Sequence, residues 1–210
     1  GRNYALPAAF ANAGILTVGS GSTLLTGDST ITNTGGTITA QTGGTVSLAN
    51  TIVLGGTLSG PGALTQSGSD SSLHGVTLAA GSTLAVSNNA SLELVTSLTN
   101  QGTVTLNATS STSNLIISGN VTIGGSGSVT LSDNANNRMG GRSSTDVLTL
   151  AAGHTIQGAG QIGVNFMGLD NQGLILANQP TSLTIDPTDA VGVTNTGTLR
   201  ANAGSTLIVT

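Results

Sequence analysis

Short apolar runs recur along the whole chain at intervals of about six to ten residues, separated by turn-forming residues. Within the runs apolar residues alternate with threonine, as in Val76-Thr77-Leu78, Val104-Thr105-Leu106 and Val129-Thr130-Leu131. A period of two puts the apolar side chains on one face of a strand and threonine on the other. No helical period competes, and Gly, Thr, Ser and Asn fill the intervals. The pattern therefore predicts short β-strands joined by turns throughout.

Two short phrases repeat at the turns. An Asn-x-Gly phrase precedes a strand at Asn33, Asn100, Asn171 and Asn195, and Gly-Ser-Thr-Leu begins at Gly21, Gly81 and Gly204, with Gly153-His-Thr-Ile as a variant. Three strand-and-turn units make a coil of about 20 residues, the size of one rung of a parallel β-solenoid. At about 4.8 Å per rung, about ten coils would form a column near 50 Å long.

The sequence thus predicts an all-β fold, a parallel β-helix of about ten coils. Residues 1–14 are expected to form an N-terminal lead-in or partial cap, and residues 15–210 a single β-solenoid domain. A β-sandwich or antiparallel barrel would show hairpin turns of the Asn-Gly or Asp-Gly kind, and neither dipeptide occurs. Asparagine at the turns instead suits hydrogen bonding to an asparagine one rung away.

Composition narrows the functional classes. Only 6% of residues are charged, the formal net charge is −4, and the cations are four arginines without any lysine, so there is no basic patch for nucleic acid. The absence of cysteine excludes disulfides and thiolate metal sites. No run of about 18 apolar residues predicts a transmembrane helix.

Three segments, residues 150–163, 169–178 and 193–202, resemble the repeats of large bacterial surface-exposed or secreted β-helix proteins of the autotransporter and filamentous-haemagglutinin-like passenger type. The resemblance covers almost the whole chain. It implies a right-handed parallel β-helix, located outside the cell or on its surface, that serves adhesion, display or fibre building. It carries no catalytic residues to transfer.

Enzymes built on β-helices need clustered carboxylates. Here the acids are scattered: Asp28, Asp70, Glu93, Asp133, Asp146, Asp170, Asp186 and Asp189. The tightest pair, Asp186 and Asp189, encloses Pro187 and is interpreted first as a turn. His74 and His154 each follow a strand-and-turn phrase, and His154, which replaces the serine of Gly-Ser-Thr-Leu, is interpreted as a turn residue. No catalytic residue, cofactor or metal ligand is assigned.

The most irregular stretch runs from Asp133 to Asp146. It lacks an apolar strand pattern and holds Arg138 and Arg142, half of the arginines. We expect either local ion pairs of these arginines with Asp133 and Asp146, or a loop that contacts a ligand or a neighbouring subunit.

Both ends of the predicted column lack a charged cap. Tyr4 and Phe10 at one end, and Leu207 and Val209 at the other, are candidate subunit-stacking residues. We therefore expect a non-enzymatic structural or adhesive β-helix that stacks on itself or on a flanking β-helix, with a glycan or surface receptor as a further partner. The alternatives are a polysaccharide-binding or polysaccharide-degrading β-helix, and an ice-binding solenoid built on Thr-x-Thr pairs.

Overall fold

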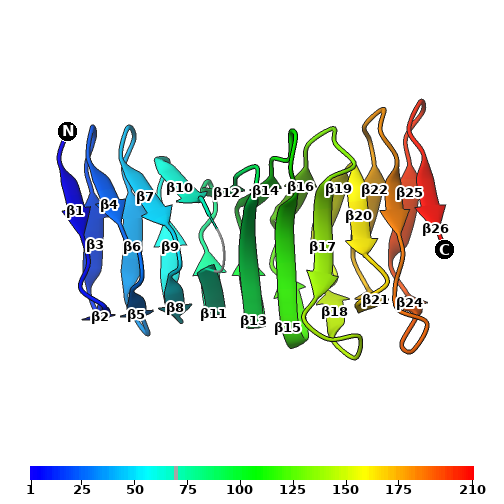
Figure 1. Cartoon of the computed structure of the whole chain (residues 1–210), viewed down its shortest axis with the longest axis horizontal. Helices are drawn as coiled ribbons and strands as arrows, with labels where there is room; N and C mark the ends of the chain where they lie inside the picture. Colours follow the sequence, from blue (N-terminus) through cyan, green and yellow to red (C-terminus); the bar gives the residue numbers. More distant parts are fainter. Residues whose placement is uncertain (69–70) are drawn as a thin grey trace.

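The computed structural model describes residues 1–68 and 71–210 and confirms the parallel β-solenoid. Every strand pairing of the described residues is parallel, and the strands stack in about nine turns along one long axis (Figure 1). Over the same ranges there is no helix, and hence none that could cross a membrane.

Each coil contributes strands to three faces. The first face holds ten strands: β1 (Asn3–Ala5), β4 (Thr23–Leu25), β7 (Thr45–Leu48), β10 (Ala63–Gln66), β12 (Thr83–Val86), β14 (Thr103–Leu106), β16 (Ser128–Leu131), β19 (Thr155–Gly158), β22 (Leu174–Ala177) and β25 (Thr198–Ala201). The second face holds β2 (Ala9–Ala11), β5 (Thr30–Thr32), β8 (Ile52–Leu54), β17 (Asn137–Gly141), β20 (Gly160–Gly163), β23 (Leu183–Ile185) and β26 (Leu207–Val209). The third holds β3 (Ile15–Val18), β6 (Thr37–Ala40), β9 (Thr57–Ser59), β18 (Val147–Leu150), β21 (Gly168–Asn171) and β24 (Val193–Asn195).

In the middle of the column, single long strands serve both the second and the third face. These are β11 (Ser71–Leu78), β13 (Ala90–Asn100) and β15 (Ser113–Gly124). Each bends without a loop, at one residue with positive φ: Gly75 (62°), Thr96 (70°) and Gly119 (75°). A left-handed residue turns the backbone sharply, which explains the register shift beside Gly75 and beside Thr96.

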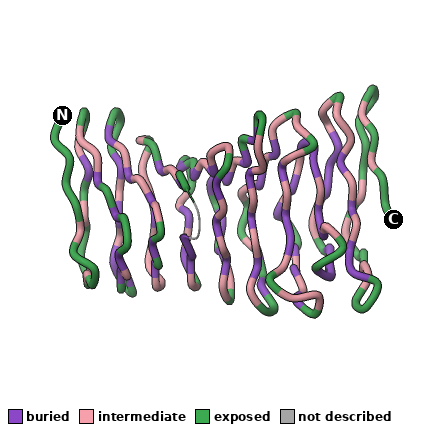
Figure 2. Tube along the Cα trace, viewed as in Figure 1, coloured by how far each residue is buried: buried purple, intermediate pink, exposed green. Residues whose placement is uncertain are grey.

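The core runs through the column as stacks of aliphatic side chains. In the first face one stack comprises Leu24, Val46, Leu64, Leu84, Val104, Val129, Ile156 and Ile175, all at most 3% exposed. The alternation of these residues with outward threonines is the period-two pattern of the sequence. Figure 2 shows buried segments along the middle of the column, whereas the first and last coils are largely exposed.

Strands of the first coil lie within residues 1–14, the segment for which the sequence predicts a lead-in or partial cap. β1 pairs with β4 and β2 pairs with β5, so residues 3–11 already form two sides of the first coil.

Coil length also varies more than expected. Eighteen residues separate Val46 from its partner Leu64, 27 separate Val129 from Ile156, and 19 separate Ile156 from Ile175.

Candidate functional site

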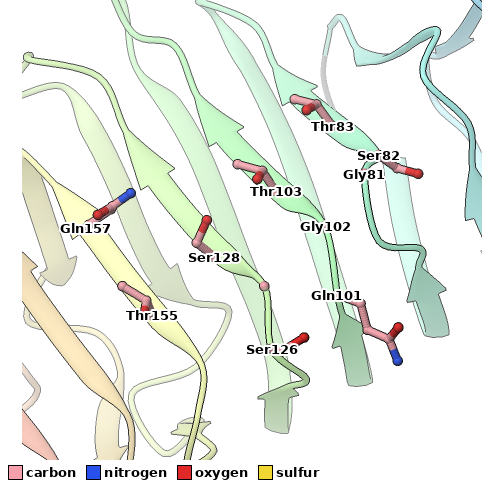
Figure 3. A pocket seen from close by; sticks show the side chains of 11 residues that line it. Gly81, Ser82, Thr83, Gln101, Gly102, Thr103, Ser126, Ser128, Thr155 and Gln157 are labelled. Carbon is pink, nitrogen blue, oxygen red and sulfur yellow. The ribbon is translucent and has the colours of Figure 1, made fainter.

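A polar groove of about 470 Å³ lies on the first face, where β12, β14, β16 and β19 begin. The first residues of these strands, Thr83, Thr103, Ser128 and Thr155, pair with one another from coil to coil and form one row of hydroxyl groups (Figure 3). Gln101, Ser126 and Gln157 flank this row, which we call the hydroxyl row. No charged residue lines the groove among the described residues.

The groove arises from the lengths of the turns that enter the first face. Residues 79–82 form a four-residue turn before β12, and residues 151–154 form one before β19. The turns before the two intervening strands are shorter: residues 101–102 lead into β14, and residues 125–127 lead into β16. Gly102 and Gly127 keep these shorter turns close to the column. A Cβ atom added at Gly102 would lie 2.3 Å from the carbonyl oxygen of Ser82. A Cβ atom added at Gly127 would lie 2.2 Å from the carbonyl oxygen of Gly102. The groove is thus a depression between two longer turns.

The side chains of the hydroxyl row form no hydrogen bond within the protein over residues 1–68 and 71–210. The next outward row on the same strands behaves differently. Thr105 Oγ1 accepts a bond from Asn107 Nδ2 (2.9 Å), and Thr130 Oγ1 accepts one from Gln157 Nε2 (3.4 Å). Hydrogen-bonding capacity therefore remains available in the hydroxyl row.

A second polar group lies on the outer surface of the second face. Ser72 Oγ and His74 Nε2 are 3.0 Å apart on β11, and Ser72 pairs with Glu93 of the next coil. His74 lies within this strand. Glu93 forms an ion pair with Arg142, at 3.1 Å between Oε1 and Nε.

The stretch from Asp133 to Asp146 differs from its expected structure. It contains a strand, β17, and Arg142 forms an ion pair with Glu93, which lies outside the stretch. Asp146 Oδ2 instead accepts the backbone N–H groups of Arg142 and Ser143, both at 2.9 Å. Asp133 Oδ1 accepts the N–H of Thr181, at 2.9 Å. The acids thus hold backbone loops in place.

Arg138 lies on the outer side of β17 between Asn114 and Gln161 of the adjacent coils. Its Nε atom is buried and has no hydrogen-bond partner among the described residues. The expected local pairing of Arg138 is therefore absent at this atom. A contact of this stretch with a ligand or subunit remains a prediction.

Three loops meet at the corner between the second and third faces, and the sequence did not reveal them. Gly168 N donates to Asp146 O (2.8 Å), Asn165 N to Asp186 O (2.7 Å) and Thr188 N to Met167 O (3.0 Å). Val164 and Asn165 both have positive φ, 53° and 50°. A valine in this left-handed conformation is strained. The sequence did not indicate this turn, because no glycine marks the two positions with positive φ.

The pair Asp186 and Asp189 belongs to this corner. Residues 188–192 form a turn in which Val191 N and Gly192 N donate to Thr188 O. The turn includes Asp189 but begins after Asp186 and Pro187, so the interpretation of the pair as one turn is confirmed only for Asp189. Asp186 Oδ1 accepts a bond from Thr210 Oγ1 at 3.1 Å. Asp70 lies outside the described residues. Within them, no three His, Asp or Glu side chains gather as a metal site would require.

Buried polar side chains fill the corner that leads into the first face. Asn171 Nδ2 donates to Asn195 Oδ1 at 2.6 Å, which confirms the expected bonding between asparagines of adjacent coils. His154 is fully buried here, with Nε2 3.5 Å from Asn100 Nδ2 and Nδ1 3.4 Å from Gly125 O. Burial lowers the pKa of His154, and the contact with the Gly125 carbonyl opposes this shift only in part.

The terminal coils expose apolar side chains and strand edges. An apolar cavity of about 520 Å³ opens at the first coil, lined by Tyr4, Leu6, Phe10, Leu16 and Leu24. At the other end Val209 is 53% exposed, and Leu199 and Leu207 are half-buried. Each terminal coil carries one charged side chain, Arg2 or Arg200.

The chain matches no protein-family model, and neither the curated proteins nor the solved structures contain a match to it. The likeness to bacterial surface β-helix proteins therefore rests on the repeated phrases alone.

Proposed function

We propose that this protein is a non-enzymatic structural or adhesive module outside the cell or on its surface. In this proposal it extends a rod by stacking its terminal coils against a second copy of itself. The observation that carries the proposal is the exposure of apolar side chains in the first and last coils, with Tyr4 52% and Val209 53% exposed, beside strands β1, β25 and β26, which stand at the ends of the strand orders of their faces. Such surfaces favour pairing with another β-strand coil, because they expose hydrogen-bonding groups and apolar area together.

A second copy fits two of the three faces. β1 of one copy would continue the stack of β25, and β2 would continue that of β26. This places Tyr4 over Leu199 and Phe10 over the apolar side chains of β26. The third face ends one strand earlier, at β24, so β3 of the second copy would face a gap of one strand there. Head-to-tail contact of this kind is heterologous and produces open chains. The gap weakens the association, and because separate copies must meet, its extent depends on concentration.

Light scattering coupled to size-exclusion chromatography tests the proposal on the 210-residue chain. The mean mass should rise with concentration. Tyr4→Lys and Val209→Lys each place a charge at one end, at residues that are 52% and 53% exposed, and should give monomers at the same concentrations. Thr122→Lys adds the same charge at an exposed position in the middle of the column and should associate like the wild type. A wild-type mass that stays monomeric, or an equal effect of Thr122→Lys, would exclude stacking.

A further inference from the structure

The groove on the first face offers a set of hydrogen-bonding groups that the protein itself leaves unused. Thr83, Thr103, Ser128 and Thr155 repeat once per coil over three rung intervals, about 14 Å at the usual strand spacing. Each hydroxyl both donates and accepts, and the amide of Gln101 adds a further donor and acceptor. The amide of Gln157 is already bonded, because its Nε2 donates to Thr130 Oγ1 and its Oε1 accepts from Asn178 Nδ2. The groove therefore suits a ligand with alternating donors and acceptors along its length.

The boundaries of the hydroxyl row give its extent. Ala63 precedes it and Leu174 follows it in the same outward position of the first face. The four-residue turns 79–82 and 151–154 lead into β12 and β19, so they lie at the levels of Thr83 and Thr155, the first and last residues of the row. Row and depression thus coincide, which limits the ligand to the length of a short oligomer.

The chemistry of the lining selects an uncharged ligand. No Asp, Glu, Arg, Lys or His lines the groove among the described residues, so an ionic ligand would lose hydration without gaining a counter-charge. An extended peptide would need free backbone groups at a sheet edge, as in strand addition. The groove lies instead on the face of a sheet, whose backbone groups bond to the adjacent coils. Side-chain hydroxyls and amides remain as the groups that can make contact.

We propose that this groove binds a short, neutral oligosaccharide that lies along the column axis, with its hydroxyl groups bonded to the hydroxyl row. The site differs from the terminal coils and does not depend on end-to-end stacking. No aromatic side chain is present for stacking on a sugar ring. The affinity is therefore weak, with a Kd on the order of 1 mM for a single site.

An NMR titration of the ¹⁵N-labelled chain tests the site directly. The probes are three neutral tetrasaccharides, cellotetraose, maltotetraose and N-acetylated chitotetraose, and the charged probe is tetragalacturonate. At least one neutral probe should shift the amide signals of residues 81–83, 101–103 and 126–128. Thr103→Val and Ser128→Ala should each raise its Kd about fivefold, the effect expected of one lost hydrogen bond.

The matched control is Thr105→Val. Thr105 lies on β14 two residues after Thr103 and faces outward on the same side, but it does not line the groove. This variant should bind like the wild type, and amide spectra will show that all three variants keep the fold. The proposal is overturned if no neutral probe shifts these signals, if tetragalacturonate binds more tightly, or if Thr105→Val weakens binding as much as Thr103→Val.

Discussion

The guanidinium group of Arg142 reaches across one intervening coil to the carboxylate of Glu93, with Nε 3.1 Å from Oε1 and Nη2 3.2 Å from Oε2. Along the second face Glu93 pairs with Ile116, and Ile116 pairs with Gly140, two residues before Arg142. This side-chain pair therefore connects the coils of β13 and β17 on the outside of the column.

We predict a small coupling energy for this pair. The side chains of Arg142 and Glu93 are 50% and 19% exposed, so water and salt screen the attraction. A double-mutant cycle with Glu93→Gln and Arg142→Gln, followed by urea unfolding, should give about 0.5 kcal/mol, decreasing further in about 1 M NaCl. A coupling energy several times larger, or one insensitive to salt, would contradict a screened surface pair.

Asn171 should matter far more to stability. Its side chain is fully buried, donates to Asn195 Oδ1 and accepts the N–H of Gly173 at 3.2 Å. Asn171→Ala leaves these buried groups unpaired, so we expect a loss of about 2 kcal/mol in the free energy of unfolding. Asn202→Ala, at an exposed turn without a side-chain hydrogen bond, is the control and should change it by less than about 0.5 kcal/mol. Equal losses in the two variants would argue against the asparagine ladder as a stabilising element.

The buried imidazole of His154 predicts sensitivity to mild acid. Its pKa in the folded protein lies below the ordinary value of 6.5, so the unfolded chain binds the proton more readily. The stability contribution of neutral His154 is complete above pH 6.5 and declines as the pH falls below it. Urea unfolding between about pH 7 and pH 5 should show this decline.

His154→Ser, which restores the usual residue of the Gly-Ser-Thr-Leu phrase, should flatten the decline between pH 7 and pH 5. His74→Gln, at the other histidine, should keep it. A pH dependence that persists in His154→Ser but disappears in His74→Gln would assign the effect to His74 and contradict the prediction for His154.

Relief of backbone strain should be measurable at Val164. A β-branched residue at φ 53° costs about 1–2 kcal/mol relative to glycine, which adopts this conformation freely but is more flexible when unfolded. Val164→Gly should therefore raise the free energy of unfolding by up to about 1 kcal/mol. Val164 Cγ2 lies 3.7 Å from the point where a Cβ atom of residue 140 would lie, so the valine side chain also packs lightly over Gly140. A clear loss of stability would mean that this packing outweighs the strain.

Much of the fold followed from local pattern. Triplets such as Val104-Thr105-Leu106 specify which side of each strand faces the core, and stacking then follows because no single coil can bury its own apolar face. Repeated phrases did not specify which corner they occupy. Asn33 lies between the second and third faces, whereas Asn171 lies between the third and the first.

The candidate site could not be predicted in the same way. The groove depends on the difference between turns of two or three residues and turns of four, which sequence periodicity does not register. The contact of Glu93 with Arg142 joins residues 49 positions apart. It depends on coil lengths that vary between 18 and 27 residues, so the register had to be known first.

Electron microscopy of negatively stained protein over a range of concentrations tests the central claim, that the terminal coils stack on one another. At about 4.8 Å per rung, one chain forms a rod about 45–50 Å long. We predict rods of uniform width whose lengths increase with concentration in steps of about this size. Tyr4→Lys should give only rods of the length of one chain at every concentration. Particles of a single length at every concentration, or side-by-side clusters without lengthening, would contradict the account.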